Sequence, residues 1–237
     1  MKRLNFFILL LVAAILSSCL KTDDQASGTG DVIVVSKKIG NNTVYGISLY
    51  AYTFSAFKSV TVASSSDASK TYTLSANQGY KTSFYYETPD AEFSSQTPSA
   101  ATYTFSAVFE NGSTATFQDV LSDKVLTVPT IENLEYDSVK NTLKVSWTKI
   151  ANADSYAISI LDGQTVVFGS TELASSLTSY TISATGGGWA VSSPPVKGKT
   201  YTIKLFAFLY ESGANSYNVQ ATALTEAPAI WGTATNN

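Results

Sequence analysis

The sequence contains no histidine, one cysteine and one arginine among its 237 residues. Without histidine there is no Ser-His-Asp or Cys-His nucleophile pair and no imidazole general base. The lone arginine, Arg3, lies at the N-terminus, so the rest of the chain lacks the usual bidentate clamp for phosphate or carboxylate ligands. These absences predict a protein that is not an enzyme and that holds no cofactor and no metal.

The N-terminal segment has the layout of a secretory signal peptide. Lys2 and Arg3 precede an apolar run from Leu4 to Leu16 that only Asn5 interrupts. A run of about 13 residues is too short to cross a hydrocarbon core of about 30 Å as a helix. An ordinary signal peptide, cleaved after small residues, and a short uncleaved anchor are the alternatives to the interpretation given next.

The only cysteine follows this run in the sequence Leu16-Ser17-Ser18-Cys19, which resembles a bacterial lipobox. The resemblance implies that the signal peptide, residues 1–18, is removed, that the Cys19 thiol is diacylated, and that the new N-terminus is acylated. Stable attachment to a membrane requires more than one acyl chain. With Cys19 used in this way, the mature fold has no thiol for zinc, haem or a disulfide.

Residues 19–30 are small and polar and predict a flexible tether behind the lipidated cysteine. Within them, Lys21-Thr22-Asp23-Asp24 looks like the acidic export signal of some Gram-negative surface lipoproteins. That resemblance implies an outer-membrane protein exposed at the cell surface; the alternative location faces the periplasm. The mature chain carries 13 lysines and 18 acidic residues, a net charge of about −5, without any block of like charge. This distribution argues against nucleic acid as a partner, since phosphates require a clustered basic surface.

From Asp31 onward the hydrophobic pattern alternates with a period of two and shows no helical period. Residues 31–127 contain about seven short alternating runs separated by turns, which predicts an immunoglobulin-like β-sandwich. The Asn111-Gly112 pair between two such runs predicts a tight hairpin in which both residues take positive φ. The expected strands lie at 32–35, 44–54, 59–63, 71–75, 82–87, 102–109 and 114–117.

Residues 128–226 contain motifs whose residue spacing is more specific than the simple alternation of residues 31–127. The segments with this spacing are Leu143–Trp147, Ala153–Ile160, Ser179–Ile182 and Lys197–Ala207. At these positions the chain resembles a fibronectin type III domain, which has a Trp ending strand B, a Tyr opening strand C and a Gly-x-x-Tyr turn into strand F. The resemblance implies that Trp147 and Tyr156 fill the space between two sheets and that Tyr201 forms a tyrosine corner.

The predicted fold class is therefore all-β, with two tandem immunoglobulin-like or fibronectin type III-like sandwiches behind a signal peptide and a tether. One departure from the family is an insertion at 186–195, between strands E and F, which contains Trp189. The final segment, 227–237, contains Trp231 and predicts an irregular tail.

The candidate ligand-binding residues are aromatic: Trp189, Trp231, Tyr50, Tyr52, Tyr85 and Tyr86. The indoles could stack on a sugar or an aromatic ligand; the alternative is that each folds back over an exposed edge of the core. The four tyrosines could form a platform on the outer face of one sheet; the alternative is ordinary cross-strand pairing.

Together these observations predict a non-enzymatic, membrane-anchored envelope lipoprotein that acts as a surface binding or adhesion module, with glycans as one ligand class. The alternative is a structural or accessory subunit of an outer-membrane uptake or assembly complex, with another envelope protein as its partner. A glycan-binding role predicts that Trp189, Trp231 or the tyrosine group is exposed and coplanar with neighbouring rings. A structural role predicts a broad apolar patch or an open edge strand.

Overall fold

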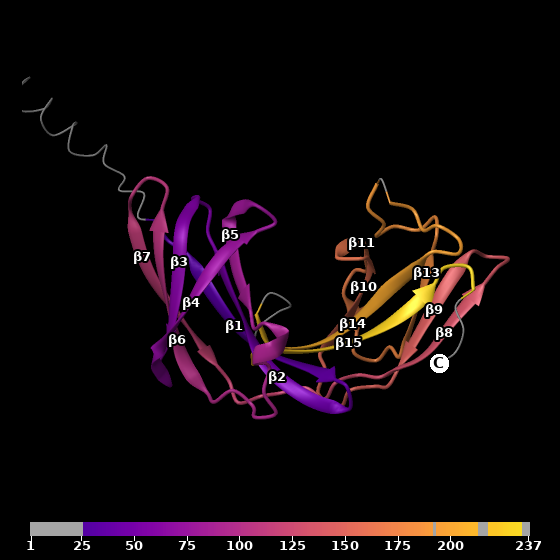
Figure 1. The fold of residues 1–237 in the computed structure, drawn as a ribbon, viewed down its shortest axis with the longest axis horizontal. Helices are drawn as coiled ribbons and strands as arrows, with labels where there is room; N and C mark the ends of the chain where they lie inside the picture. The colour runs from indigo at the N-terminus through magenta and orange to yellow at the C-terminus, as the bar shows by residue number, and fades with distance from the viewer. Residues whose placement is uncertain (1–25, 192, 213–217, 234–237) are drawn as a thin grey trace, which may run out of the picture.

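The computed structural model describes residues 26–191, 193–212 and 218–233, and these form strands connected by turns and loops. The predicted signal peptide, Cys19 and most of the predicted tether lie outside the described residues. Figure 1 shows two β-sandwich modules standing side by side and joined at one edge. The predicted all-β class is confirmed.

The first module contains the seven strands that the alternating pattern predicts. In β6, for example, Tyr103, Phe105 and Ala107 point into the core while Thr104 and Ser106 point outward. A short 3₁₀ turn, η1 (Asp90–Glu92), lies in the loop after the fifth strand. The strands are β1 (Thr29–Ile39), β2 (Asn42–Tyr52), β3 (Phe57–Ser64), β4 (Asp67–Asn77), β5 (Tyr80–Glu87), β6 (Ala101–Phe109) and β7 (Thr114–Leu121).

The predicted two-residue hairpin at Asn111-Gly112 is wrong in detail. The connection between β6 and β7 spans four residues, and Gly112 alone takes a positive φ, of 84°. The Gly112 amide donates to the Phe109 carbonyl, and the Asn111 side chain accepts from the Ser113 amide at 3.0 Å. The asparagine therefore serves as a side-chain acceptor within the turn, a second role that asparagine commonly plays.

The strands of the first module form two facing sheets, with the order β1-β2-β5 on one side and β4-β3-β6-β7 on the other. β4 also pairs briefly with β5, which links the two sheets at one corner. At the opposite corner, the Asp119 carboxylate on β7 accepts a hydrogen bond of 2.8 Å from the Val32 amide on β1. The core fills the space between them.

The second module repeats this arrangement. Its first, second and late strands form the sheet β8-β9-β13, and the facing sheet has the order β11-β10-β14-β15. Apart from the short strand β12, each strand matches one strand of the first module in pairing order. The strands are β8 (Ile131–Asp137), β9 (Thr142–Trp147), β10 (Ser155–Asp162), β11 (Thr165–Gly169), β12 (Leu173–Ala174), β13 (Ser179–Ser183), β14 (Thr200–Tyr210) and β15 (Val219–Ile230).

The core contacts implied by the resemblance are present in the second module. Trp147 and Tyr156 are fully buried, with ring centroids 5.4 Å apart. The Tyr156 hydroxyl accepts a hydrogen bond from the Ile150 amide at 2.8 Å. The Tyr201 hydroxyl accepts one from the Val196 amide at 3.0 Å, so the predicted contact of a tyrosine corner with upstream backbone is confirmed.

The two modules share one sheet. β1 of the first module pairs in parallel with β15 of the second, from Val34 opposite Ala221 to Lys37 opposite Leu224. The strand order β11-β10-β14-β15-β1-β2-β5 is consequently continuous across both modules. In Figure 1, β15, β1 and β2 form the base of a U whose two arms are the modules. The tandem modules are therefore joined side by side through backbone hydrogen bonds.

The C-terminal boundary differs from the prediction. β15 continues to Ile230 and stays paired with β14 up to the Thr200–Ile230 position, so residues 227–230 are strand rather than irregular tail. The strand passes through Pro228 in a stretch where β15 has β14 alone as a partner in the described chain. Because one side of β15 is open there, the missing proline N–H breaks no ladder on that side.

Candidate ligand groove

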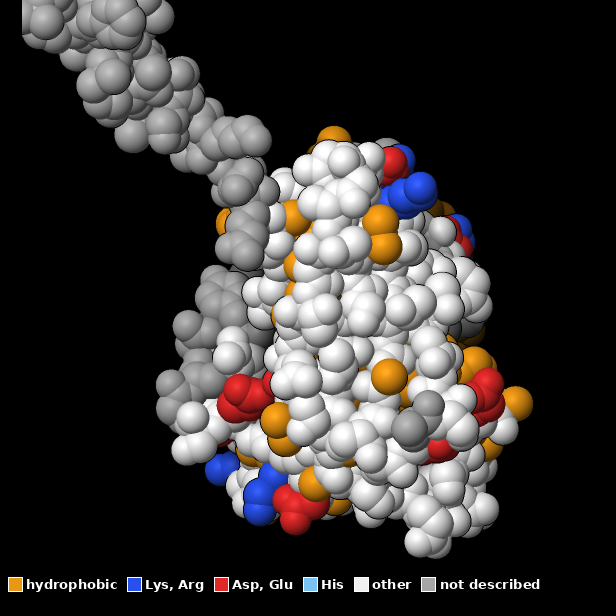
Figure 2. Space-filling view, turned by 90° about the vertical axis from the view of Figure 1, so that its left-hand side faces the viewer, with side chains coloured by type: hydrophobic (Ala, Val, Ile, Leu, Met, Phe, Trp, Pro, Cys, Tyr) orange, Lys and Arg blue, Asp and Glu red, His pale blue; other side chains and the backbone are white. Residues whose placement is uncertain are grey.

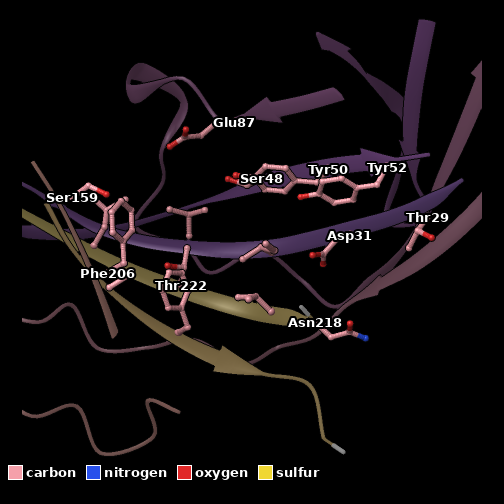
Figure 3. Close-up of a pocket in the computed structure, with 16 residues that line it drawn as sticks. Thr29, Asp31, Ser48, Tyr50, Tyr52, Glu87, Ser159, Phe206, Asn218 and Thr222 are labelled. Atoms are coloured by element: carbon pink, nitrogen blue, oxygen red, sulfur yellow. The ribbon is translucent and has the colours of Figure 1, made fainter. Parts of the chain in front are cut away.

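A groove of about 820 Å³ lies on the concave face of the shared sheet, between the two modules. We call it the joint groove. Its floor comes from β1 and β15, with Ile33, Val35, Thr222 and Leu224, and its two walls come from one strand pair of each module. Figure 3 shows these side chains projecting from neighbouring strands toward a common space.

Strand alternation explains which side chains reach the groove. On β2, Leu49 and Ala51 are fully buried in the core of the first module, so Ser48, Tyr50 and Tyr52 face the opposite way. On β14, Leu205 and Ala207 fill the core of the second module, and Phe206 and Phe208 face the groove. The shared sheet brings these two outward faces together.

Three of the four predicted tyrosines, Tyr50, Tyr52 and Tyr85, form a row on the outward face of β2 and β5, and the first two of them line the groove. The rings of Tyr50 and Tyr52 are parallel within 3°, with centroids 6.0 Å apart. Tyr85, which pairs with Tyr50 across β2 and β5, lies 6.3 Å from it at 23°. Tyr52 is 44% exposed and Tyr85 37%, so both rings have a face that a ligand can reach.

Tyr86 does not belong to this row. It pairs with core residue Leu49 and points to the other face of the sheet, where its ring packs at 5.1 Å against Tyr72. Adjacent residues of a strand point to opposite faces, so Tyr85 and Tyr86 cannot share a platform.

The two tryptophans lie in the second module, away from the groove. Trp231 is 2% exposed, and its Nε1 donates to the Asn141 side chain at 3.1 Å. Trp189 packs edge-on against Trp231 at 5.4 Å and against Phe168 at 5.0 Å, and its Nε1 donates to the Ser183 carbonyl at 2.8 Å. The structure thus gives both indoles the core-covering role that was the alternative to ligand stacking.

The sequence reasoning missed the second wall of the groove. Phe206 and Phe208, two residues apart on β14, are parallel within 6° and have centroids 6.1 Å apart. The available signal was their place in an alternating strand, between core residues at 203, 205 and 207. A single module gives such residues only a solvent-facing position; the joint makes them the wall of a groove.

Asp31 is the second feature that sequence reasoning missed. It lies on β1 opposite Tyr50 and lines the groove. Burial, together with the nearby carboxylates of Asp119 and Glu211, raises the Asp31 pKa from 3.8 to about 7. Burial and the neighbouring Tyr50 also raise the pKa of Tyr52 to about 12.

The charge of the lining has one sign. Asp31 and Glu87 are its ionisable acids, and none of the described lining residues is a lysine or an arginine. The outer sheet of the first module looks different: Figure 2 shows a surface with few charged side chains and only scattered apolar ones. That face therefore differs in character from the groove lining.

In the part of the chain that the structure describes, no three His, Cys, Asp or Glu residues gather closely enough to hold a metal ion. None of the described segments is a helix with the length and apolarity needed to cross a membrane.

No protein-family model and no curated protein matches the chain. Solved structures do: a two-domain fibronectin type III segment of chicken tenascin is 15% identical, covers 86% of this chain and 99% of its own length, and has a TM-score of 0.29. The BSP domain of a biofilm associated protein is 16% identical over 86% of this chain, with a TM-score of 0.25. A tetra-tandem repeat from the extending region of a large adhesion protein is 18% identical over 85%, with a TM-score of 0.25.

The present chain spans 30% of the biofilm protein chain and 49% of the adhesion protein chain. The class that the fold defines is an all-β protein of two sandwiches.

Proposed function

We propose that this protein is a non-enzymatic envelope lipoprotein that acts as a surface binding or adhesion module, with the joint groove as its ligand site and glycans as its ligands. The observation that carries the proposal is the parallel pair Tyr50 and Tyr52 on one wall of the groove, with Tyr85 stacked beside Tyr50 outside the lining. A sugar can pack on the exposed face of such rings, and Tyr52 and Tyr85 are 44% and 37% exposed.

The chemistry of the groove suits a sugar. Sugar rings have apolar C–H faces that pack on the face of an aromatic ring, and hydroxyl groups around their edges that need hydrogen-bond partners. The groove offers tyrosine and phenylalanine rings beside the side chains of Ser48, Glu87 and Ser159. Ligand sites commonly combine an apolar lining with a few polar groups in this way.

The anchor in this proposal is Cys19, seven residues before the first described residue, Ala26. The lipobox resemblance and the tether composition support an outer-membrane location with exposure at the cell surface; the periplasm-facing location is the alternative. Cys19→Ser removes the acylated thiol, so we expect the protein to move from the membrane fraction to the soluble fraction. Protease treatment of intact cells then distinguishes the two faces, because protein that faces the periplasm is protected.

Binding is tested by probing a glycan array with the mature protein and with the Tyr50→Ala/Tyr52→Ala variant. We expect the wild type to retain a subset of glycans and the variant to lose them. Tyr80→Ala is the matched control, because Tyr80 is 67% exposed and lies outside the groove lining. Equal retention by all three proteins, or no retention by the wild type, would overturn the groove as a glycan site.

A second candidate function is an accessory role in an outer-membrane uptake or assembly complex. The edge of the sheet favours it: β7 ends the strand order, and Val120 on this strand is 60% exposed. An exposed edge strand is a surface to which another protein can add a strand. Crosslinking of whole cells tests this function, and recovery of the protein alone would contradict it.

A further inference from the structure

The joint groove has aromatic pairs on both walls, one pair from each module. Tyr50 and Tyr52 come from β2, and Phe206 and Phe208 come from β14. Within each pair the rings are nearly parallel and about 6 Å apart, because the residues are two positions apart on one strand. Each wall is therefore an extended apolar strip, a shape that suits a chain of flat units better than one compact molecule.

Between these walls the floor is mostly apolar, and polar side chains stand at intervals along it. Ile33, Val35 and Leu224 provide the apolar surface, and Asp31 and Thr222 provide polar atoms within it. In Figure 3, Phe206 and Tyr50 lie on opposite sides of this floor, and Asp31 points into the space near Tyr50. A ligand that fills the groove meets both modules and needs apolar faces and hydrogen-bonding groups in alternation.

The charge of the groove restricts the ligand further. Asp31 and Glu87 line it, and the Asp119 and Glu211 carboxylates lie close enough to Asp31 to disfavour its ionised form. No described lining residue supplies a compensating lysine or arginine. A ligand that brings its own carboxylate, sulfate or phosphate would bury a like charge against these groups, which is unfavourable in a partly desolvated site.

We propose that the joint groove binds an uncharged oligosaccharide that lies across the floor and packs on the Tyr50–Tyr52 pair of one module and the Phe206–Phe208 pair of the other. This inference rests on the proposed binding function and deepens it in two ways: it names the ligand class, and it makes the site depend on both modules. Acidic glycans are disfavoured by the charge of the lining, and a ligand must contact both modules to use both aromatic pairs.

The test is calorimetric titration of the mature protein with oligosaccharides of matched length. The neutral probes are maltohexaose, cellohexaose, xylohexaose and laminarihexaose, and the acidic probes are oligogalacturonate and hyaluronan hexamers. We expect one neutral probe to bind and the acidic probes to bind at least tenfold more weakly. For that neutral probe, Tyr50→Ala and Phe206→Ala should each weaken binding about five- to twentyfold, since buried aromatic contacts dominate recognition.

Three controls keep the result interpretable. Tyr50→Phe retains the ring and should bind within about threefold of the wild type, which separates loss of stacking from loss of folding. Tyr80→Ala changes an exposed tyrosine outside the groove and should bind like the wild type. Asp31→Asn removes one lining charge and should reduce the preference for neutral over acidic probes.

The outcomes separate this inference from the function on which it rests. Tight binding of an acidic probe, or a loss of affinity in Tyr50→Ala but none in Phe206→Ala, overturns the inference while leaving a glycan-binding module. Two results together overturn both the inference and the binding function. They are absence of binding to every probe in the titration, and an array on which the wild type retains no glycan or the Tyr50→Ala/Tyr52→Ala variant retains as much as the wild type. Binding of a neutral probe that is weakened by Tyr50→Ala and by Phe206→Ala supports both the inference and the binding function.

Discussion

At the scale of single residues, Asp31 shows how the proposed ligand groove holds a side chain at an energetic cost. Strand alternation places it on the groove side of β1, where burial and two neighbouring carboxylates disfavour its negative charge. A folding requirement alone would favour an uncharged polar residue at this position. Its presence is consistent with a role in ligand selection.

The raised pKa of Asp31 predicts how stability depends on pH. Between pH 4 and 7 the folded state holds a proton that the unfolded state has lost, so the contribution of this group to the free energy of unfolding falls as pH rises. The difference between pKa values of 3.8 and about 7 corresponds to at most about 4 kcal/mol.

Asp31→Asn should therefore stabilise the protein at pH 8 and leave its stability nearly unchanged below pH 4. Urea denaturation of both proteins across this pH range measures the difference in the free energy of unfolding. A variant that is less stable than the wild type at pH 8 would show that the Asp31 carboxylate is favourably paired in the folded protein.

The sequence correctly predicted the face to which a side chain points where strand alternation alone determines it. Tyr50 and Tyr52 were assigned to a common outward face, and the structure confirms that placement. The prediction that Tyr86 shares this face is wrong, because its register with Leu49 directs it to the core. The burial of Trp189 and Trp231 depends on tertiary contacts with Phe168, Asn141 and each other, which no local pattern encodes.

At the scale of elements, the prediction and the structure differ most informatively at the C-terminal end of β15. The sequence predicts an irregular tail over 227–237, and Pro228 within it argues locally against a strand. The structure extends the strand through it because β14 supplies pairing partners up to Thr200. This extension carries Trp231 into the core beside Tyr136, with ring centroids 5.9 Å apart.

Trp231→Ala should consequently cost about 3–5 kcal/mol of stability, the range typical of truncating a large buried aromatic residue. Trp189→Ala should cost less, because its ring is only partly buried. Guanidinium denaturation of the two variants gives both values. A loss below about 1 kcal/mol for Trp231→Ala would mean that the segment after β15 contributes little to the core.

At the scale of the whole molecule, the sequence predicted two β-sandwich modules. It did not predict the pairing of β1 with β15 that joins them. Each module rests on local alternation and turn signals, whereas the joint pairs segments that are about 190 residues apart through only four matched positions. One signal was present: Val32, Ile33, Val34 and Val35 form a continuous apolar run, and all four are buried. Such a run is typical of a strand covered on both faces, as in parallel pairing.

The shared sheet also fixes the geometry of the proposed ligand site. Two modules connected only by a linker would present two separate aromatic strips whose relative position varies. Backbone pairing between β1 and β15 fixes the Tyr50–Tyr52 strip opposite the Phe206–Phe208 strip and so creates the groove. The ligand class proposed above depends on this rigidity, because a fixed site loses less conformational entropy on binding.

The measurement that tests this account most directly is the distribution of distances between the modules in solution. Lys58 and Lys140 are exposed and lie on different modules, so Lys58→Cys/Lys140→Cys in a Cys19→Ser background allows spin labels at these two positions. Double electron–electron resonance should give one narrow distance distribution, unchanged when oligosaccharide is added. A broad distribution, as expected for modules that move independently, would contradict the shared sheet and with it the joint groove.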